Sequence, residues 1–154
     1  SRFAQAHANQ KPHDMKTALI TGASSDIGRA IARTLPATKF NLALHYFSNG
    51  EKALALQQEF AARQSDCALF CRDLTDPQQA RSLIEEVAGR FTSIDVLVNV
   101  VGPFVYKHVL DITPDEWAED LALNLHTCLH QKRKRSVSPK GMSVAPALVA
   151  SRRA

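Results

Sequence analysis

Residues 21–28 read Thr-Gly-Ala-Ser-Ser-Asp-Ile-Gly and join a short apolar run, residues 17–21, to a stretch of helical periodicity. A glycine directly after a strand permits a tight turn, and a glycine that opens a helix lets backbone approach a phosphate. The free amides and the positive dipole end of that helix then face a diphosphate. The stretch therefore predicts a strand–turn–helix unit that binds a dinucleotide, although a plain left-handed turn would use the same two glycines.

Runs of β-branched and aliphatic residues alternate with helical patterns on both sides of this turn. The predicted strands are 17–21, 40–45, 67–71 and 94–101, and the predicted helices are 27–35, 51–64, 77–91 and one from 114 onward with Trp117, Leu121, Leu125 and Cys128 on its core face. Strands separated by helices predict βαβ units and a parallel sheet with right-handed crossovers. We therefore expect an α/β, Rossmann-type doubly wound fold, here with four strands in the order 3-2-1-4.

Composition places the chain among ordinary globular proteins. Its 154 residues are 45% apolar and 22% charged, which excludes a wholly disordered chain, a collagen-like fibre and a small disulfide scaffold. No apolar stretch is long enough to span a bilayer, and residues 1–14 lack the apolar run of a signal peptide. We expect 1–14 to be a loose leader, 15–130 to be one partial domain, and the protein to be cytoplasmic.

The net charge of +4 belongs to the last segment of the chain. Residues 131–154 hold seven basic and no acidic residues, so residues 1–130 carry a net charge of −3. A basic nucleic-acid surface across the domain is therefore unsupported, and the Lys-Arg-Lys-Arg run at 132–135 lacks the aromatic residues that stack on bases. We expect 131–154 to be a basic tail, disordered or produced by a frame shift.

Three cysteines leave at least one thiol unpaired, and their spacing matches no common zinc pattern. We expect all three to be reduced, with the two in the predicted strand 67–71 buried as small apolar side chains. The run 126–130 places two histidines one helical turn apart, but Thr127 stands where the zincin motif needs a glutamate. We therefore predict no metal site.

Five stretches in the expected order resemble the short-chain dehydrogenase/reductase family, a Rossmann-fold group of NAD(P)-dependent oxidoreductases. Residues 21–28 resemble its TGxxxGxG segment, Asp73-Leu74 its aspartate–aliphatic pair beside the adenine, and residues 99–102 its NNAG segment. Residues 115–124 resemble the helix that presents the active-site asparagine, here Asn124. His45-Tyr46 with residues 50–53 resemble reductases that act on pteridines or on β-ketoacyl chains held by a carrier protein. The resemblance covers about residues 15–130.

The resemblance implies a set of cofactor-binding residues and two departures from the family pattern. The implied residues are Gly22, Ser24, Ser25, Ile27, Gly28, Tyr46, Ser48, Asn49, Asp73, Leu74, Asn99 and Gly102. Asp26 replaces the middle glycine of the first motif, and Val100 replaces the second asparagine of NNAG. Pteridine-reductase-like members also lack that glycine, so binding is not excluded. A carboxylate beside a diphosphate should weaken affinity unless it points outward.

The end of the second predicted strand bears on the choice of cofactor. NAD-binding Rossmann domains place an acid there, roughly 20 residues after the glycines, to hold the ribose 2′-hydroxyl. Residues 46–49 contain no acid, and Glu51 is the first to follow. Ser48 or Asn49 could donate to a 2′-phosphate, although the same residues could simply form a loop. The absence of an acid therefore favours NADP(H) over NAD(H). Residues 46–49 also contain no lysine or arginine that would bind the 2′-phosphate.

The family's catalytic tyrosine, with its lysine four residues later and its upstream serine, follows the active-site asparagine. The chain's two tyrosines, Tyr46 and Tyr106, both precede Asn124, which leaves Asn124 as the one catalytic family residue. We expect an NADP(H)-dependent carbonyl reductase that is truncated and inactive alone. The alternatives are a non-catalytic nucleotide-binding module and an interaction protein that uses the basic tail.

The expected partners are the dinucleotide and, in the complete family fold, a small-molecule carbonyl substrate, with no membrane and no nucleic acid. A homo-oligomer would form through the helix 114–130 or through the exposed edge of the strand 94–101, because an unpaired apolar edge invites pairing.

Overall fold

The computed structural model describes residues 15–63, 65–102, 107–122, 124 and 143–146. In chain order the elements are β1 (Lys16–Thr21), α1 (Asp26–Thr34), β2 (Phe40–Tyr46), α2 (Gly50–Ala62), β3 (Cys67–Cys71), α3 (Pro77–Phe91), β4 (Val96–Asn99), the 3₁₀ helix η1 (Val109–Asp111), α4 (Pro114–Leu121) and β5 (Ser143–Pro146).

The strands form one parallel sheet in the order β3-β2-β1-β4-β5, which confirms the predicted order 3-2-1-4 for the first four. The chain leaves β1 toward β2 and β3 on one side and returns to place β4 on the other. Leu19 of β1 lies opposite Ala43 of β2 and Leu97 of β4. The carboxyl ends of β1 and β4 therefore meet where the strand order reverses, the point at which doubly wound sheets bind ligands.

The fifth strand was not predicted. β5 pairs in parallel with β4 along Val96–Asn99. This corrects the expectation that β4 would be an exposed edge through which copies associate. A four-residue strand is too short to show a period in the sequence, and an unpaired strand edge accepts any extended backbone that reaches it.

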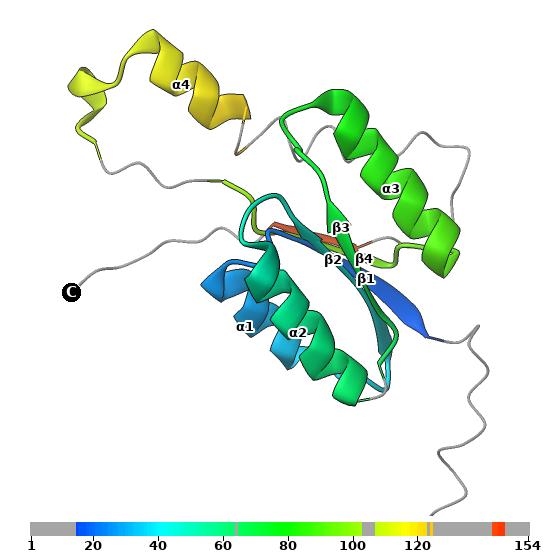
Figure 1. Ribbon diagram of the computed structural model, residues 1–154. Coiled ribbons are helices and arrows are strands. Elements are labelled where there is room, and N and C mark those ends of the chain that lie inside the picture. Colours follow the sequence, from blue (N-terminus) through cyan, green and yellow to red (C-terminus); the bar gives the residue numbers. More distant parts are fainter. Residues whose placement is uncertain (1–14, 64, 103–106, 123, 125–142, 147–154) are drawn as a thin grey trace, which may run out of the picture.

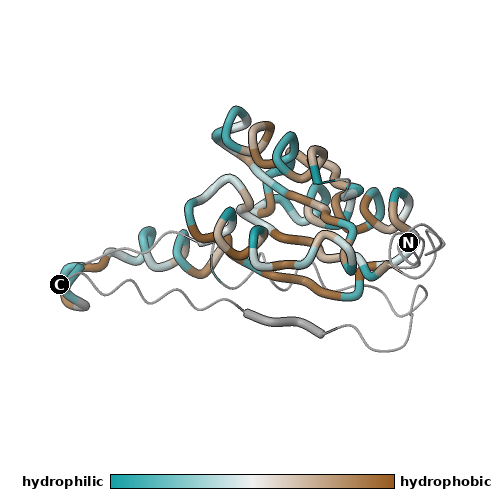
Figure 2. The backbone as a smooth tube through the Cα atoms, turned by 90° about the horizontal axis from the view of Figure 1, so that it is seen from below, coloured by the Kyte–Doolittle hydropathy of each residue, from teal (hydrophilic) through white to brown (hydrophobic). Residues whose placement is uncertain are grey.

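Helices cover both faces of the sheet, α1 and α2 on one and α3 on the other (Figure 1). The alternation of side chains along β1 explains this, because Leu19 points to the α3 face while Ala18 and Ile20 point to the α1–α2 face. All three are fully buried. Figure 2 shows the same arrangement as apolar strands between helices whose hydropathy alternates.

The helix starts follow their sequence signals. Ser25 caps α1, and its Oγ accepts the Gly28 amide at 3.0 Å. Asp76 caps α3, whose observed bounds match the prediction. Thr113 and Glu116 form a complete capping box at the start of α4.

Two local predictions are wrong. The side chain of Trp117 is 57% exposed, and α4 has no buried residue in its described part, where the periodicity predicted a core face. Figure 1 shows the reason, since α4 lies beyond the end of the sheet. Cys71 is exposed because it is the last residue of β3. Leu125 and Cys128 lie outside the described residues.

Association through the helix 114–130 stays a prediction, since only its first part is described. None of the helices in the described ranges has the length and apolar content needed to cross a bilayer.

Candidate dinucleotide-binding site

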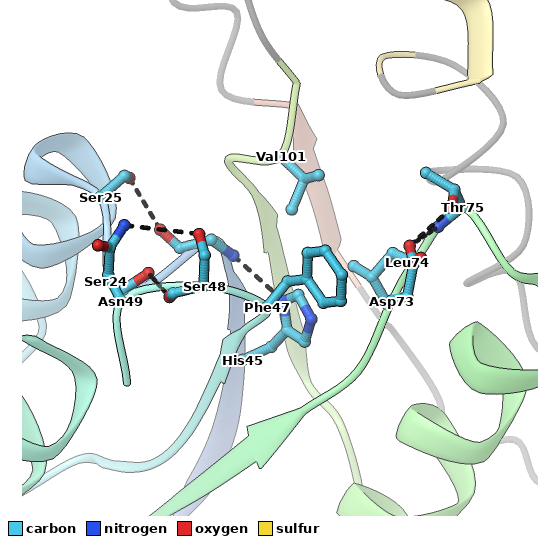
Figure 3. Close-up of a pocket in the computed structure, with 11 residues that line it drawn as sticks. Ser24, Ser25, His45, Phe47, Ser48, Asn49, Asp73, Leu74, Thr75 and Val101 are labelled. Carbon is cyan, nitrogen blue, oxygen red and sulfur yellow. Dashed lines mark hydrogen bonds between the residues drawn. The ribbon is translucent and has the colours of Figure 1, made fainter. Parts of the chain in front are cut away.

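A cavity of about 340 Å³ lies at the carboxyl ends of the first four strands (Figure 3). Residues from every one of these strand ends line it: Gly22, Ser24, Ser25, His45, Phe47, Ser48, Asn49, Asp73, Leu74, Thr75 and Val101. Its position is the one that the reversal of strand order predicts for a ligand.

The turn from Gly22 to Gly28 (the glycine turn) forms one wall of the cavity. Gly22 has φ +65°, and a Cβ atom there would lie 2.8 Å from the carbonyl oxygen of Val100. No residue with a side chain fits without strain. The Gly22 carbonyl accepts both the amide and the hydroxyl of Ser25, at 3.0 and 2.8 Å. The turn therefore leads directly into the N-terminus of α1.

Gly28 brings α1 against the turn. A Cβ atom at Gly28 would overlap the carbonyl oxygen of Gly22, so the helix can pack this closely only with glycine. The amides of Gly22 and Ala23 are already bonded to His45. The Gly28 amide donates to Ser25 Oγ, so the amides of the first turn of α1 that remain for an anion are those of Asp26 and Ile27, which no carbonyl of the helix can reach. The positive end of the helix dipole strengthens this site.

Asp26 does not line the cavity. Its side chain is 83% exposed and bonds the Arg29 guanidinium at 2.5 Å. That hydrogen bond and the charges of Arg29 and Lys52 lower the pKa of the Asp26 carboxyl. The Asp26 carboxylate is thus charged and exposed to solvent. In this position it repels a bound diphosphate less than a carboxylate inside the cavity would. Lys52 is a nearby cation that the sequence analysis overlooked.

The end of β2 and the start of α2 form the next part of the wall. The Ser24 hydroxyl donates to the Ser48 carbonyl at 3.1 Å and so ties this segment to the glycine turn. Asn49 has φ +58°, and its side chain does not cap α2. Tyr46 does not line the cavity. Its ring lies under Gly50, where an added Cβ would be 3.3 Å from the ring, so Tyr46 supports the segment from below.

The opposite end of the cavity is formed by the segment after β3. Asp73 Oδ1 accepts the amide and the hydroxyl of Thr75, at 2.9 and 2.6 Å, while the Asp73 amide donates to Gln79. Leu74 is nearly buried, and Phe47 is 65% exposed with its ring among the lining residues (Figure 3). An apolar slot with a carboxylate at its edge suits a flat heterocycle that carries an amino group.

Asn99 lies at the end of β4 and does not line the cavity. It is 7% exposed, and its Oδ1 accepts the Thr21 hydroxyl at 2.6 Å. The same hydroxyl oxygen accepts the Val100 amide at 3.2 Å. This chain of hydrogen bonds joins the carboxyl ends of β1 and β4, and so holds the glycine turn beside the residues that follow β4.

Asn124 lies against the segment after β4. Gly102 has φ +144°, and a Cβ there would overlap Asn124 Oδ1. The Asn124 amide donates to the Asp120 carbonyl at 3.1 Å. The structure thus brings Asn124 to Gly102, although neither lines the cavity.

A match to the short chain dehydrogenase family covers residues 16–139. The chain belongs to this family. Among curated relatives, it is 36% identical over 110 residues to "3-oxoacyl-[acyl-carrier-protein] reductase FabG" of Staphylococcus aureus, an alignment that covers 71% of this chain and 45% of that protein. It is 34% identical over 119 residues to "D-beta-hydroxybutyrate dehydrogenase" of Rhizobium meliloti, with 77% and 46% covered. The chain thus spans less than half the length of these relatives.

Solved structures of the short-chain type share the fold. A blue fluorescent protein from a metagenomic library, in complex with NADPH, matches with a TM-score of 0.70 at 30% identity, over 79% of this chain and 50% of that one. A short chain dehydrogenase from Burkholderia cenocepacia in complex with NADP matches with a TM-score of 0.70 at 32% identity, over 75% and 47%.

The family resemblance and the cavity agree on only part of the predicted cofactor set. Gly22, Ser24, Ser25, Ser48, Asn49, Asp73 and Leu74 line the cavity, whereas Ile27, Gly28, Tyr46, Asn99 and Gly102 do not. As contacts of a cofactor, all of these stay predictions. Sequence reasoning missed four lining residues: His45, Phe47, Thr75 and Val101. Their positions, at or just after predicted strand ends, were the available signal.

In the described ranges, no three histidine, cysteine or acidic side chains gather as metal ligands. Residues 126–130, whose two histidines were considered as metal ligands in the sequence, lie outside those ranges. Most of the basic tail also lies outside them. Cys67 and Cys71 are free thiols, and burial raises the pKa of Cys67 to about 12, which makes it unreactive.

Proposed function

We propose that this chain is the cofactor-binding part of an NADP(H)-dependent oxidoreductase that reduces a carbonyl to an alcohol by hydride transfer. The observation that carries the proposal is the single cavity into which the glycine turn, the end of β2 and the segment after β3 all face. The Staphylococcus aureus relative is named as a 3-oxoacyl reductase, and this supports carbonyl reduction. The structures in complex with NADPH and NADP support the cofactor.

The residues present fit a dinucleotide. The first amides of α1, with Ser24 and Ser25 beside them, would hold the diphosphate. Asp73 and Leu74 would hold the adenine, because Asp73 Oδ1 is oriented by Thr75 and the slot beside it is apolar. A bound nicotinamide cofactor supplies the hydride; the protein's part is to fix its position and exclude water.

The preference for NADP(H) rests on charge at the end of β2. Ser48 and Asn49 line the cavity, and neither they nor their neighbours at 46–47 bring an acid toward the position of the ribose 2′-oxygen. Asn49 is left-handed, and its side chain does not cap α2. The Lys52 amide donates to the Asn49 carbonyl at 3.1 Å, so the amides at the start of α2 that no helix carbonyl can reach are those of Gly50 and Glu51, and these would face an anion. Lys52, in the first turn of α2, adds a positive charge close enough to lower the pKa of Asp26.

Fluorescence titrations with NADPH and NADH on the full chain test this preference. Ser48→Asp should weaken NADPH binding at least about tenfold and leave NADH binding unchanged or stronger, since a carboxylate that repels the 2′-phosphate replaces a hydroxyl donor. Lys52→Gln should weaken NADPH alone. Lys39→Gln is the matched control, because Lys39 precedes β2 at the opposite end of the sheet. Equal losses for both cofactors in Ser48→Asp would contradict the assignment.

We further propose that this 154-residue chain binds cofactor without turnover, because it contains no tyrosine after Asn124. A tyrosine general acid needs a lowered pKa and a place beside the carbonyl, and Tyr46 lies under Gly50 instead. Saturable NADPH binding with no loss of NADPH absorbance on adding a 3-oxoacyl thioester is the expected result. Turnover would refute this part. The alternative, a non-catalytic nucleotide-binding module, would give the same two results. Only a chain that continues into the family's tyrosine segment would distinguish the reductase from this module.

We also propose a cytoplasmic location, where free thiols stay reduced.

A further inference from the structure

His45, at the end of β2, joins the two halves of the candidate site. Its side chain is 1% exposed and lies beneath the cavity. Its Nδ1 accepts the Gly22 amide at 3.3 Å, drawn as a dashed line in Figure 3, and its Nε2 lies 2.8 Å from the carbonyl oxygen of Arg72. Its main-chain carbonyl accepts the Ala23 amide at 2.8 Å. One residue thus holds two successive amides of the glycine turn and the end of β3.

These partners determine the protonation state of the ring. A carbonyl oxygen only accepts, so Nε2 must carry the hydrogen that is donated to Arg72. A backbone amide only donates, so Nδ1 must be bare to accept from Gly22. The neutral tautomer with hydrogen on Nε2 satisfies both. A protonated imidazole would turn a second donor toward the Gly22 N–H, and the turn would have to move.

The surroundings of the ring shift the pKa of His45 in both directions. Burial is the main cause that lowers the pKa of His45, and the Arg72 guanidinium lowers it further. The hydrogen bond to the Arg72 carbonyl and the charge of Asp73 raise it. Arg72 and Asp73 both come from the end of β3, and the side chains of the glycine turn that line the cavity, Ser24 and Ser25, carry no charge. The neutral form is therefore the one present near neutral pH.

We propose that His45 is a positioning residue of the cofactor site: only its uncharged ring keeps the glycine turn in the shape that receives the diphosphate, so proton binding and dinucleotide binding oppose each other. This inference rests on the proposed function. By linkage the opposition is reciprocal, and a bound dinucleotide makes His45 harder to protonate. Simple electrostatics predicts the opposite sign, because a cation beneath a diphosphate would attract it. The direction of the pH effect therefore separates geometry from charge.

The first test is the dissociation constant of NADPH on the full chain from about pH 8 to about pH 5, across the range in which histidine titrates. The matched variant is His45→Asn, whose side-chain oxygen can accept from Gly22 but does not titrate. NADPH itself also binds protons in this pH range, and this affects its dissociation constant equally for the wild-type chain and for His45→Asn. We expect the wild-type chain to lose at least about tenfold more affinity than His45→Asn, the size of one lost hydrogen bond at the turn. Parallel profiles, or wild-type binding that tightens in acid, would overturn the proposal.

The second test needs no cofactor. In the wild-type chain, nuclear magnetic resonance should show the Gly22 amide signal shifting together with the protonation of the His45 ring. A ring that protonates without any response of Gly22, or that stays neutral until the chain unfolds, would overturn the proposal. If NADPH binds at no pH, the proposed function fails, and the Gly22 signal still decides the role of His45.

Discussion

Replacing Gly28 with alanine tests the packing of α1 against the glycine turn. The added Cβ would overlap the carbonyl oxygen of Gly22, a backbone atom that cannot swing away. Overpacking of this kind costs about 1–3 kcal/mol, and we expect the upper end because the neighbour is backbone. The gain in helix propensity from glycine to alanine returns up to about 1 kcal/mol. The net loss of unfolding free energy should be about 1–2 kcal/mol.

Gly89→Ala is the matched control, since Gly89 also lies inside a helix and its added Cβ would meet nothing within 4 Å. It should stabilise the chain by up to about 1 kcal/mol. Urea denaturation of both variants should therefore separate them by about 2–3 kcal/mol. Gly28→Ala should also weaken NADPH binding, while Gly89→Ala should not. Equal stabilities of the two variants would refute the reasoning that close backbone packing requires glycine at this turn.

Three further changes have defined outcomes. Asp26→Gly should tighten NADPH binding by no more than about threefold at low salt, because the carboxylate is exposed and paired with Arg29; a tenfold gain would show that it faces the diphosphate. Because the pKa of His45 is lower in the folded chain, the unfolded chain takes up a proton at this ring at a higher pH than the folded chain does. The free energy of unfolding, measured in urea, should therefore fall as the pH drops below about 6.5, and His45→Asn should reduce this dependence on pH. Leu83→Ala should cost about 2–5 kcal/mol because Leu83 is fully buried, whereas Leu54→Ala, at a residue 48% exposed, should cost under about 1 kcal/mol in thermal or urea unfolding.

The sheet and its helices could be predicted because their signals are local. Pro77 at the first turn and an apolar stripe with helical spacing predicted α3 with the bounds that the structure has. The alternation of strands and helices predicted the parallel order of β1 to β4. Periodicity shows which face of a helix is apolar but not what covers that face, and Trp117 was misplaced for this reason.

The motif predicted the tight turn at Gly22 and the close packing of α1 at Gly28, because both depend on the backbone alone. The role of His45 could not be predicted, because its partners Gly22 and Arg72 lie 23 and 27 residues away in sequence and meet it only in the folded sheet. Asp26 was expected beside the diphosphate, and only the structure shows that it turns to Arg29.

The central claim is that the start of α1 receives the diphosphate of a dinucleotide. Amide chemical shifts of the full chain, recorded during a titration with NADPH, test it most directly. The claim predicts saturable changes that are largest at residues 24–27, with smaller ones near Ser48 and Asp73. Saturable binding that leaves the amides of residues 24–27 unmoved, with its largest changes elsewhere, would contradict it.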